Sequence, residues 1–108
     1  MFFFSGVFAA DQIEPVDLSV FSTEGESVTL KCSYSSGSEN VVLYWYRQYP
    51  NRAPQYLLRR GARAYGDGQA ADGRFELRTS SSSTDLTVRE VRLADTALYY
   101  CALRVAAQ

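Results

Sequence analysis

Short stretches in which apolar and polar residues alternate recur along the chain, and this period of two predicts β-strands. The clearest stretch begins after Ser27, where Val28, Leu30, Cys32 and Tyr34 share one face that we expect to be half buried. Further strands are expected over residues 41–48, 55–60, 74–78, 85–91 and 98–103, and a short edge strand is expected within residues 11–21, broken at residue 15 by a proline. Turn residues separate these segments, and neither a helical period nor a repeat is present. The pattern therefore predicts a sandwich of two antiparallel sheets.

The segment at residues 41–48 has an unusual outer face. Trp45 falls on the core side, whereas Tyr44, Tyr46 and Gln48 fall on the opposite side. In the segment at residues 98–103, Tyr100 is expected on the same outer face. Tyrosines beside a glutamine combine apolar area with polar tips, and this composition is typical of protein interfaces. The alternative interpretation is a monomer that exposes some tyrosine.

The spacing of four side chains indicates which type of sandwich the chain forms. Cys32 and Cys101 lie about seventy residues apart, with Trp45 between them and Tyr99 shortly before the second cysteine. This spacing fits an immunoglobulin-type sandwich, in which a disulfide joins the sheets, the tryptophan packs on the bridge and the tyrosine bonds backbone at a corner. We therefore expect a structural bridge between Cys32 and Cys101, which contributes about 4 kcal/mol through loop closure. The alternative is a pair of unrelated buried thiols.

Composition and charge exclude several kinds of chemistry. The formal net charge of −1 gives no general basic surface for nucleic acid. The chain has no histidine, and both of its cysteines are assigned to the bridge, so we expect neither a metal site nor a cofactor. The serine run at residues 80–83 offers hydroxyl groups without a base to activate them. An enzyme is therefore not expected.

The first ten residues are mostly apolar and are typical of the end of a secretory signal. We interpret residues 1–10 as a signal remnant with cleavage near Ala9 or Ala10, and residues 11–108 as the domain. An edge strand is the alternative interpretation of the segment. The apolar segment at residues 1–10 is too short to cross a bilayer, so we expect no direct membrane insertion of this fragment. A signal and a disulfide both indicate an oxidising compartment.

Two motifs resemble a known family. Cys32 with Trp45-Tyr46-Arg47-Gln48, and the stretch from Asp95 to Leu103, resemble an immunoglobulin V-set domain, in particular the variable segment of a T-cell receptor alpha chain and, next, of a delta chain. The resemblance implies an all-β, two-sheet Greek-key sandwich and an antigen receptor on the extracellular face of the plasma membrane. Complete members continue into a joining segment with Phe-Gly-x-Gly, which this sequence does not contain. The resemblance therefore implies a germline or truncated segment whose last strand is missing.

The resemblance also implies which residues take part in binding. A beta-type variable domain is expected to pair through Tyr46, Gln48, Pro54, Leu57 and Tyr100. A peptide held by a major histocompatibility molecule is expected at three hypervariable loops, at residues 36–42, 60–66 and from residue 102 onward. The candidate contact residues are Gly37, Ser38, Glu39, Asn40, Arg60, Arg63, Tyr65, Leu103 and Arg104. The fold also implies a partly buried salt bridge between Arg74 and Asp95 across the bottom of the sandwich.

Two other binding or structural roles stay open from the sequence. A V-set innate receptor or adhesion domain whose gene does not rearrange would encode its last strand in the same exon. A purely structural domain of a larger chain would not recruit a variable-domain partner.

Overall fold

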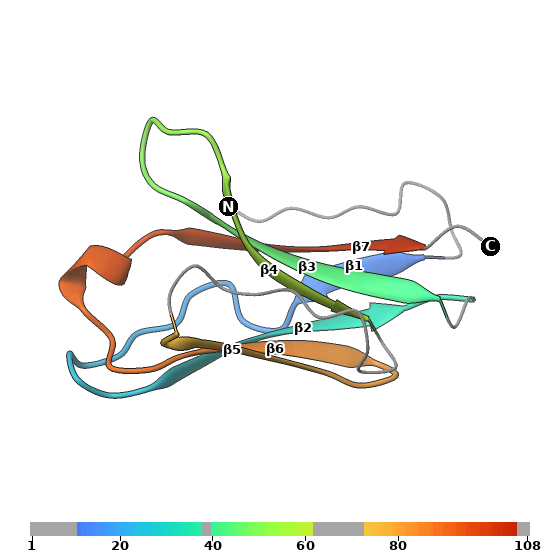
Figure 1. Ribbon diagram of the computed structural model, residues 1–108, viewed down its shortest axis with the longest axis horizontal. Helices are drawn as coiled ribbons and strands as arrows, with labels where there is room; N and C mark the ends of the chain where they lie inside the picture. Colours follow the sequence, from blue (N-terminus) through green and yellow to red (C-terminus); the bar gives the residue numbers. More distant parts are fainter. Residues whose placement is uncertain (1–10, 38–39, 62–72, 106–108) are drawn as a thin grey trace.

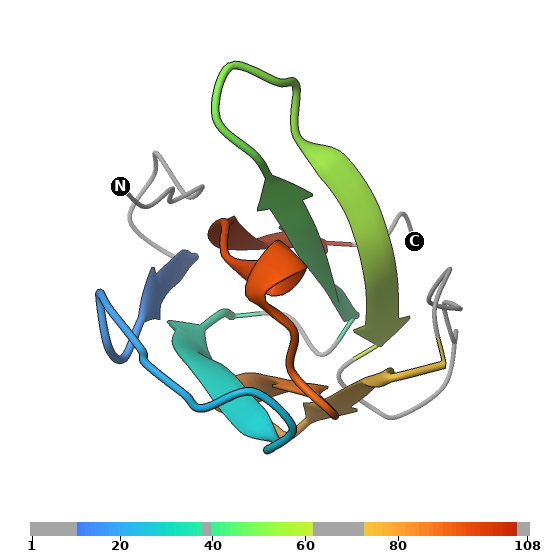
Figure 2. The same cartoon turned by 90° about the vertical axis from the view of Figure 1, so that its left-hand side faces the viewer.

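The computed structural model describes residues 11–37, 40–61 and 73–105, which form two antiparallel sheets that face each other (Figure 1). One sheet has the strand order β1 (Gln12–Pro15), β2 (Val28–Ser35), β6 (Ser83–Val88) and β5 (Phe75–Thr79). The other has the order β4 (Gln55–Gly61), β3 (Val41–Gln48) and β7 (Leu98–Val105). Figure 2 views the same two layers from one end. The predicted all-β sandwich is confirmed. The expected signal remnant lies outside the described residues.

Alternation along the strands decides which side chains form the core. Along β3, Val41, Leu43 and Trp45 are buried and the residues between them are not. The bounds of β3 are those expected from the sequence. The strand expected to start at residue 85 begins at Ser83 and ends at Val88, and the last strand extends to residue 105 rather than 103. Strand ends are set by cross-strand pairing, which the pattern of one segment does not reveal.

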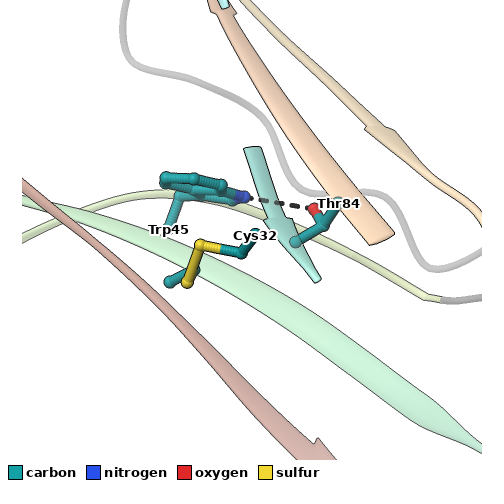
Figure 3. The surroundings of a disulfide bond; sticks show 4 residues. Cys32, Trp45 and Thr84 are labelled. Carbon is teal, nitrogen blue, oxygen red and sulfur yellow. Dashed lines mark hydrogen bonds between the residues drawn. A yellow bond between two sulfur atoms is a disulfide. The ribbon is translucent and has the colours of Figure 1, made fainter. Parts of the chain in front are cut away.

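The disulfide between Cys32 and Cys101 joins β2 of one sheet to β7 of the other, with a Cα–Cα distance of 6.6 Å. Trp45 lies beside the bridge and is 2% exposed (Figure 3). Its indole Nε1 donates a hydrogen bond of 3.1 Å to the hydroxyl of Thr84, which is completely buried. A buried indole N–H needs such an acceptor. The bridge, the tryptophan and this hydrogen bond together fix the distance between the sheets.

A short 3-10 helix, η1 (Leu93–Asp95), leads into β7, and the sequence pattern gave no sign of it. Here the hydroxyl of Tyr99 donates to the backbone oxygen of Asp95 at 2.6 Å, which is the expected corner bond. Tyr99 is only partly buried, less than expected, and packs against the core.

No helix among the described residues is long and apolar enough to cross a membrane.

The predicted salt bridge between Arg74 and Asp95 is confirmed. The guanidinium donates two hydrogen bonds, from Nη1 to Oδ2 at 2.9 Å and from Nη2 to Oδ1 at 3.0 Å. The carboxylate also accepts the backbone N–H of Arg92 at 2.8 Å. The hydrogen bonds from Arg74 lower the pKa of Asp95 below its ordinary value of 3.8, although burial acts in the opposite direction. The pair ties the start of β5 to the helical turn before β7.

Candidate partner-binding face

The outer face of the β4-β3-β7 sheet brings together tyrosines from three strands. Tyr46 of β3 pairs with Tyr100 of β7 and with Tyr56 of β4. Residues directly opposite each other in antiparallel strands share a face, and so do residues two apart in one strand. Tyr44 and Gln48 therefore lie on the same face as Tyr46. The prediction that Tyr46, Gln48 and Tyr100 share one outward face is confirmed.

Contacts among these side chains hold them in place. The rings of Tyr44 and Tyr46 stack with 6.4 Å between centroids, and Tyr56 meets Tyr46 edge-on at 6.0 Å. The hydroxyl of Tyr100 donates to Oε1 of Gln48 at 2.6 Å. Nε2 of Gln48 donates to a backbone oxygen in the turn between β3 and β4 at 2.8 Å. Both ends of the glutamine amide are therefore bound, and its orientation is fixed within this domain.

Leu57 was expected on this face, and that prediction is wrong. Tyr46 pairs with Tyr56, whereas the residue before Tyr46 pairs with Leu58, so Leu57 is the extra residue of a β-bulge. Leu57 and Leu58 are 3% and 4% exposed and both belong to the core. Tyr56, which is 42% exposed, takes the place expected for Leu57. Pro54 is exposed immediately before β4.

Comparison with known proteins identifies the type of sandwich. The family described as Immunoglobulin V-set domain matches residues 16–108. The chain belongs to the immunoglobulin V-set family. Human T cell receptor alpha variable 3 is 37% identical over 107 residues, which cover 96% of this chain and 90% of that protein. Human T cell receptor alpha variable 38-1 is 36% identical over 81 residues, with coverage of 73% and 68%. Human T cell receptor alpha variable 14/delta variable 4 is 31% identical over 97 residues, with coverage of 88% and 82%.

These relatives confirm the resemblance to the variable segments of T-cell receptor alpha chains. The family consists of binding domains and is not enzymatic, as expected from the sequence. The chain is thus a receptor-like, extracellular type of immunoglobulin domain. Antigen recognition is consistent with this membership, because variable domains are binding modules on a rigid sandwich.

The loop residues proposed for this V-set domain lie in different environments. Gly37 is exposed, and its N–H donates to a carboxylate oxygen of Asp11 at 3.3 Å. Asn40 is partly buried just before β3. Leu103 is partly buried and packs against the core, so little of its side chain is available to a ligand. Four further candidates of the first two loops lie outside the described residues: Ser38, Glu39, Arg63 and Tyr65.

Two arginines expected at ligand-contact positions have neighbours within the V-set domain. Arg60 lies in β4, opposite Leu43, and its Nη1 donates to the backbone oxygen of Leu77 in β5 at 3.1 Å. This bond links the edges of the two sheets, so Arg60 is not the free loop residue that we expected. Arg104 is exposed near the end of β7, and its Nε donates to the hydroxyl of Tyr44 at 3.1 Å. We call the outer face formed by Tyr44, Tyr46, Gln48, Tyr56 and Tyr100 the tyrosine face. Arg104 therefore belongs to the tyrosine face rather than to a loop tip.

The titratable groups with shifted pKa values in this V-set domain have structural roles. Burial raises the pKa of Tyr34, whose hydroxyl donates to the backbone oxygen of Ser80. Burial, together with the nearby charge of Asp95, raises the pKa of Tyr99. Within residues 11–37, 40–61 and 73–105 no group of three or more potential metal ligands is present.

Proposed function

We propose that this chain is the antigen-recognition variable domain of an alpha-like T-cell receptor chain. It pairs with a beta-type variable domain and, with that partner, binds peptide presented by a major histocompatibility molecule. The observation that carries the proposal is the tyrosine face, formed by Tyr44, Tyr46, Gln48, Tyr56 and Tyr100. Aromatic side chains with polar tips are the anchors that protein interfaces favour.

The direction of the strands supports binding of the peptide and its presenting molecule at one end of the sandwich. Val42, at the start of β3, pairs with Gly61 at the end of β4 and with Arg104 near the end of β7. The start of β3 and the ends of β4 and β7 therefore lie at the same end of the sandwich. Figure 1 shows the ends of β2 and β7 close to the start of β3. Loops gathered at one end of a rigid sandwich are where such domains bind.

Titration with soluble beta-type variable domains tests the proposal. The wild-type chain is expected to form a one-to-one complex, measured by surface plasmon resonance and by sedimentation. The variant Tyr46→Ala removes a central anchor and is expected to weaken the dissociation constant by about thirtyfold, the equivalent of about 2 kcal/mol. The control variant Phe21→Ala removes an aromatic side chain that is 90% exposed and is not one of the five residues of this face. Its affinity is expected to stay unchanged, and equal losses in both variants would contradict the proposal.

A delta-type receptor chain is the second candidate. It is supported by relatives whose names include a delta variable segment, such as human T cell receptor alpha variable 14/delta variable 4. Sequencing transcripts beyond Gln108 distinguishes the candidates, because the joining and constant segments identify the chain type. A last strand encoded in the same exon would instead favour an innate receptor or adhesion domain.

A further inference from the structure

The two sheets differ in the charges that their strands carry. The strands β3, β4 and β7 contain no aspartate or glutamate and four arginines, namely Arg47, Arg59, Arg60 and Arg104. The four strands of the other sheet contain three acidic and two basic residues, namely Glu14, Glu76, Asp85, Lys31 and Arg78. A net charge of −1 for the whole chain therefore conceals a sheet whose strands carry only positive charge.

Two of the four arginines point away from the tyrosine face. Arg60 is bound to the backbone of β5, as described above. Arg47 pairs with Tyr99 on the inner side, its Nη2 donates to Oε1 of Gln55 at 3.0 Å, and its guanidinium lies over the rings of Tyr49 and Phe75. Both guanidinium groups therefore have partners within the domain, although Nε of Arg47 is buried without a hydrogen-bond partner.

The other two arginines lie on the tyrosine face, on either side of Tyr44. Arg59 is opposite Tyr44 in the pairing of β3 with β4, and it is exposed. Among the described residues its guanidinium has neither a hydrogen bond nor an ion pair. The guanidinium of Arg104 lies 5.8 Å from the centroid of the Tyr44 ring, in addition to its bond to the hydroxyl. We call Arg59, Tyr44 and Arg104 the basic cluster.

We propose that the partner domain presents aspartate or glutamate side chains to the basic cluster, and that this face selects a partner sheet with carboxylates at that end. This inference rests on the proposed function. Carboxylates would supply the charge-assisted acceptors that the two guanidinium groups lack on this face. An uncharged partner surface would instead desolvate the arginines without compensation, which costs free energy.

The same charges argue against a second copy of this chain as the occupant of the face. A symmetric pair brings the same patch of both copies into one interface. Two copies would therefore bring four outward arginines together, and the strands of the face contribute no acidic residue to offset them. Like charges placed together at an interface suppress such pairing.

The aromatic neighbours prepare the basic cluster for binding. A guanidinium held over an aromatic ring loses little further freedom when it meets a carboxylate. The stack of Tyr44 on Tyr46 links the basic cluster to the centre of the tyrosine face. The acidic contact is therefore expected at one end of an otherwise aromatic interface, where it sets the orientation and the rate of association.

The test uses a panel of soluble beta-type variable domains, some with and some without carboxylates on the outer face of the corresponding sheet. Domains with carboxylates are expected to bind the wild-type chain more tightly. The double variant Arg59→Gln/Arg104→Gln is expected to weaken that binding about tenfold and to remove most of its dependence on salt. The variant Arg59→Lys/Arg104→Lys keeps both charges and should retain most of the salt dependence, which separates loss of charge from misfolding.

The control variant Lys31→Gln/Arg78→Gln removes the same charge from the opposite sheet. There the ion pairs are weak, at 3.9 Å between Lys31 and Asp85 and 3.6 Å between Arg78 and Glu76, so binding should change less than about twofold. Tight binding that is equal in all variants and insensitive to salt would overturn the acidic contact and leave the proposed function standing. Failure of the wild-type chain to bind any domain of the panel would overturn both.

Discussion

The unpaired edge of β7 leads to a prediction about stability. Among the described residues, β7 pairs with β3 and is the end strand of its sheet. A cavity of about 420 Å³ opens beside it, lined on one side by residues 96–99 and on the other by residues 17–22. On that second side Leu18 is 77% exposed and Val20 is 40% exposed, and Val16, directly before that segment in the sequence, is 53% exposed. Appending a strand with Phe-Gly-x-Gly should pair with β7 and cover this region.

The expected gain follows from the exposed apolar surface. Full burial of a valine or leucine side chain contributes about 1.5 to 3 kcal/mol. Since these three side chains are already partly covered, an added strand would contribute about 1 kcal/mol from each, or about 3 kcal/mol together. Ordering the added strand costs about 1 to 2 kcal/mol for each residue fixed, and its ladder hydrogen bonds, at about 0.5 to 1.5 kcal/mol each, together with the burial of its own apolar side chains offset this cost. A net gain of about 1 kcal/mol raises the melting temperature by about 4 to 8 °C.

Differential scanning calorimetry of both versions, oxidised and at equal concentration, measures this shift. A third version, in which the appended strand carries two prolines at pairing positions, is the control, because proline cannot donate to the ladder. It should melt like the original chain. The original chain should also self-associate in light scattering, because an open strand edge invites pairing with another edge. Equal melting temperatures with every version monomeric would refute the reasoning.

Three other substitutions test contacts inside the sandwich. Asp95→Asn should destabilise the fold by about 3 kcal/mol in urea unfolding, because it leaves its buried arginine partner without a counter-charge. The pKa of Asp95 is lowered in the folded state, so its contribution to the free energy of unfolding should be present above about pH 4 and be lost as the pH falls through the folded pKa. In Asp95→Asn the free energy of unfolding should therefore depend less on pH in the acid range. Thr84→Val should cost about 1 to 3 kcal/mol, because the indole N–H of Trp45 loses its acceptor, whereas the less buried Thr87→Val should cost little. Arg60→Gln should lower stability by about 1 kcal/mol and leave partner affinity unchanged; a loss of affinity without a loss of stability would restore Arg60 as a contact residue.

The sequence predicted the features that depend on local alternation or on fixed spacing. The bounds of β3 followed from alternation, because its inner residues all face one core. The bridge and the corner bond of Tyr99 followed from spacing that one type of sandwich requires. The pair of Arg74 with Asp95 was implied by that fold and not by spacing. The prediction of these contacts does not depend on the exact strand ends, because each contact joins residues at fixed places in the fold.

Features that depend on contacts between distant segments were missed. The bulge at Leu57 shifts the pairing with β3 by one residue, and no turn residue in the sequence marks it. The partner of Trp45 is Thr84, on the facing sheet, and its sequence neighbours do not distinguish it from the other hydroxyl residues near it. The position of Arg104 over Tyr44 depends on how far β7 extends, which only its pairing with β3 determines. Long-range register therefore decides where each predicted site residue lies in the fold.

The tyrosine face combines exposure with internal restraint, and this combination bears on affinity. Immobilising a side chain on binding costs about 0.5 to 1.5 kcal/mol. On this face the amide of Gln48 is bound at both ends, Tyr46 packs between Tyr44 and Tyr56, and Arg104 is held on a ring before any partner is present. Most of the conformational entropy of these side chains is therefore already lost on folding, and little more is lost on binding. A partner domain that offers a complementary surface gains the burial of aromatic area with little further ordering, so an interface of ordinary size on this sheet can be stable.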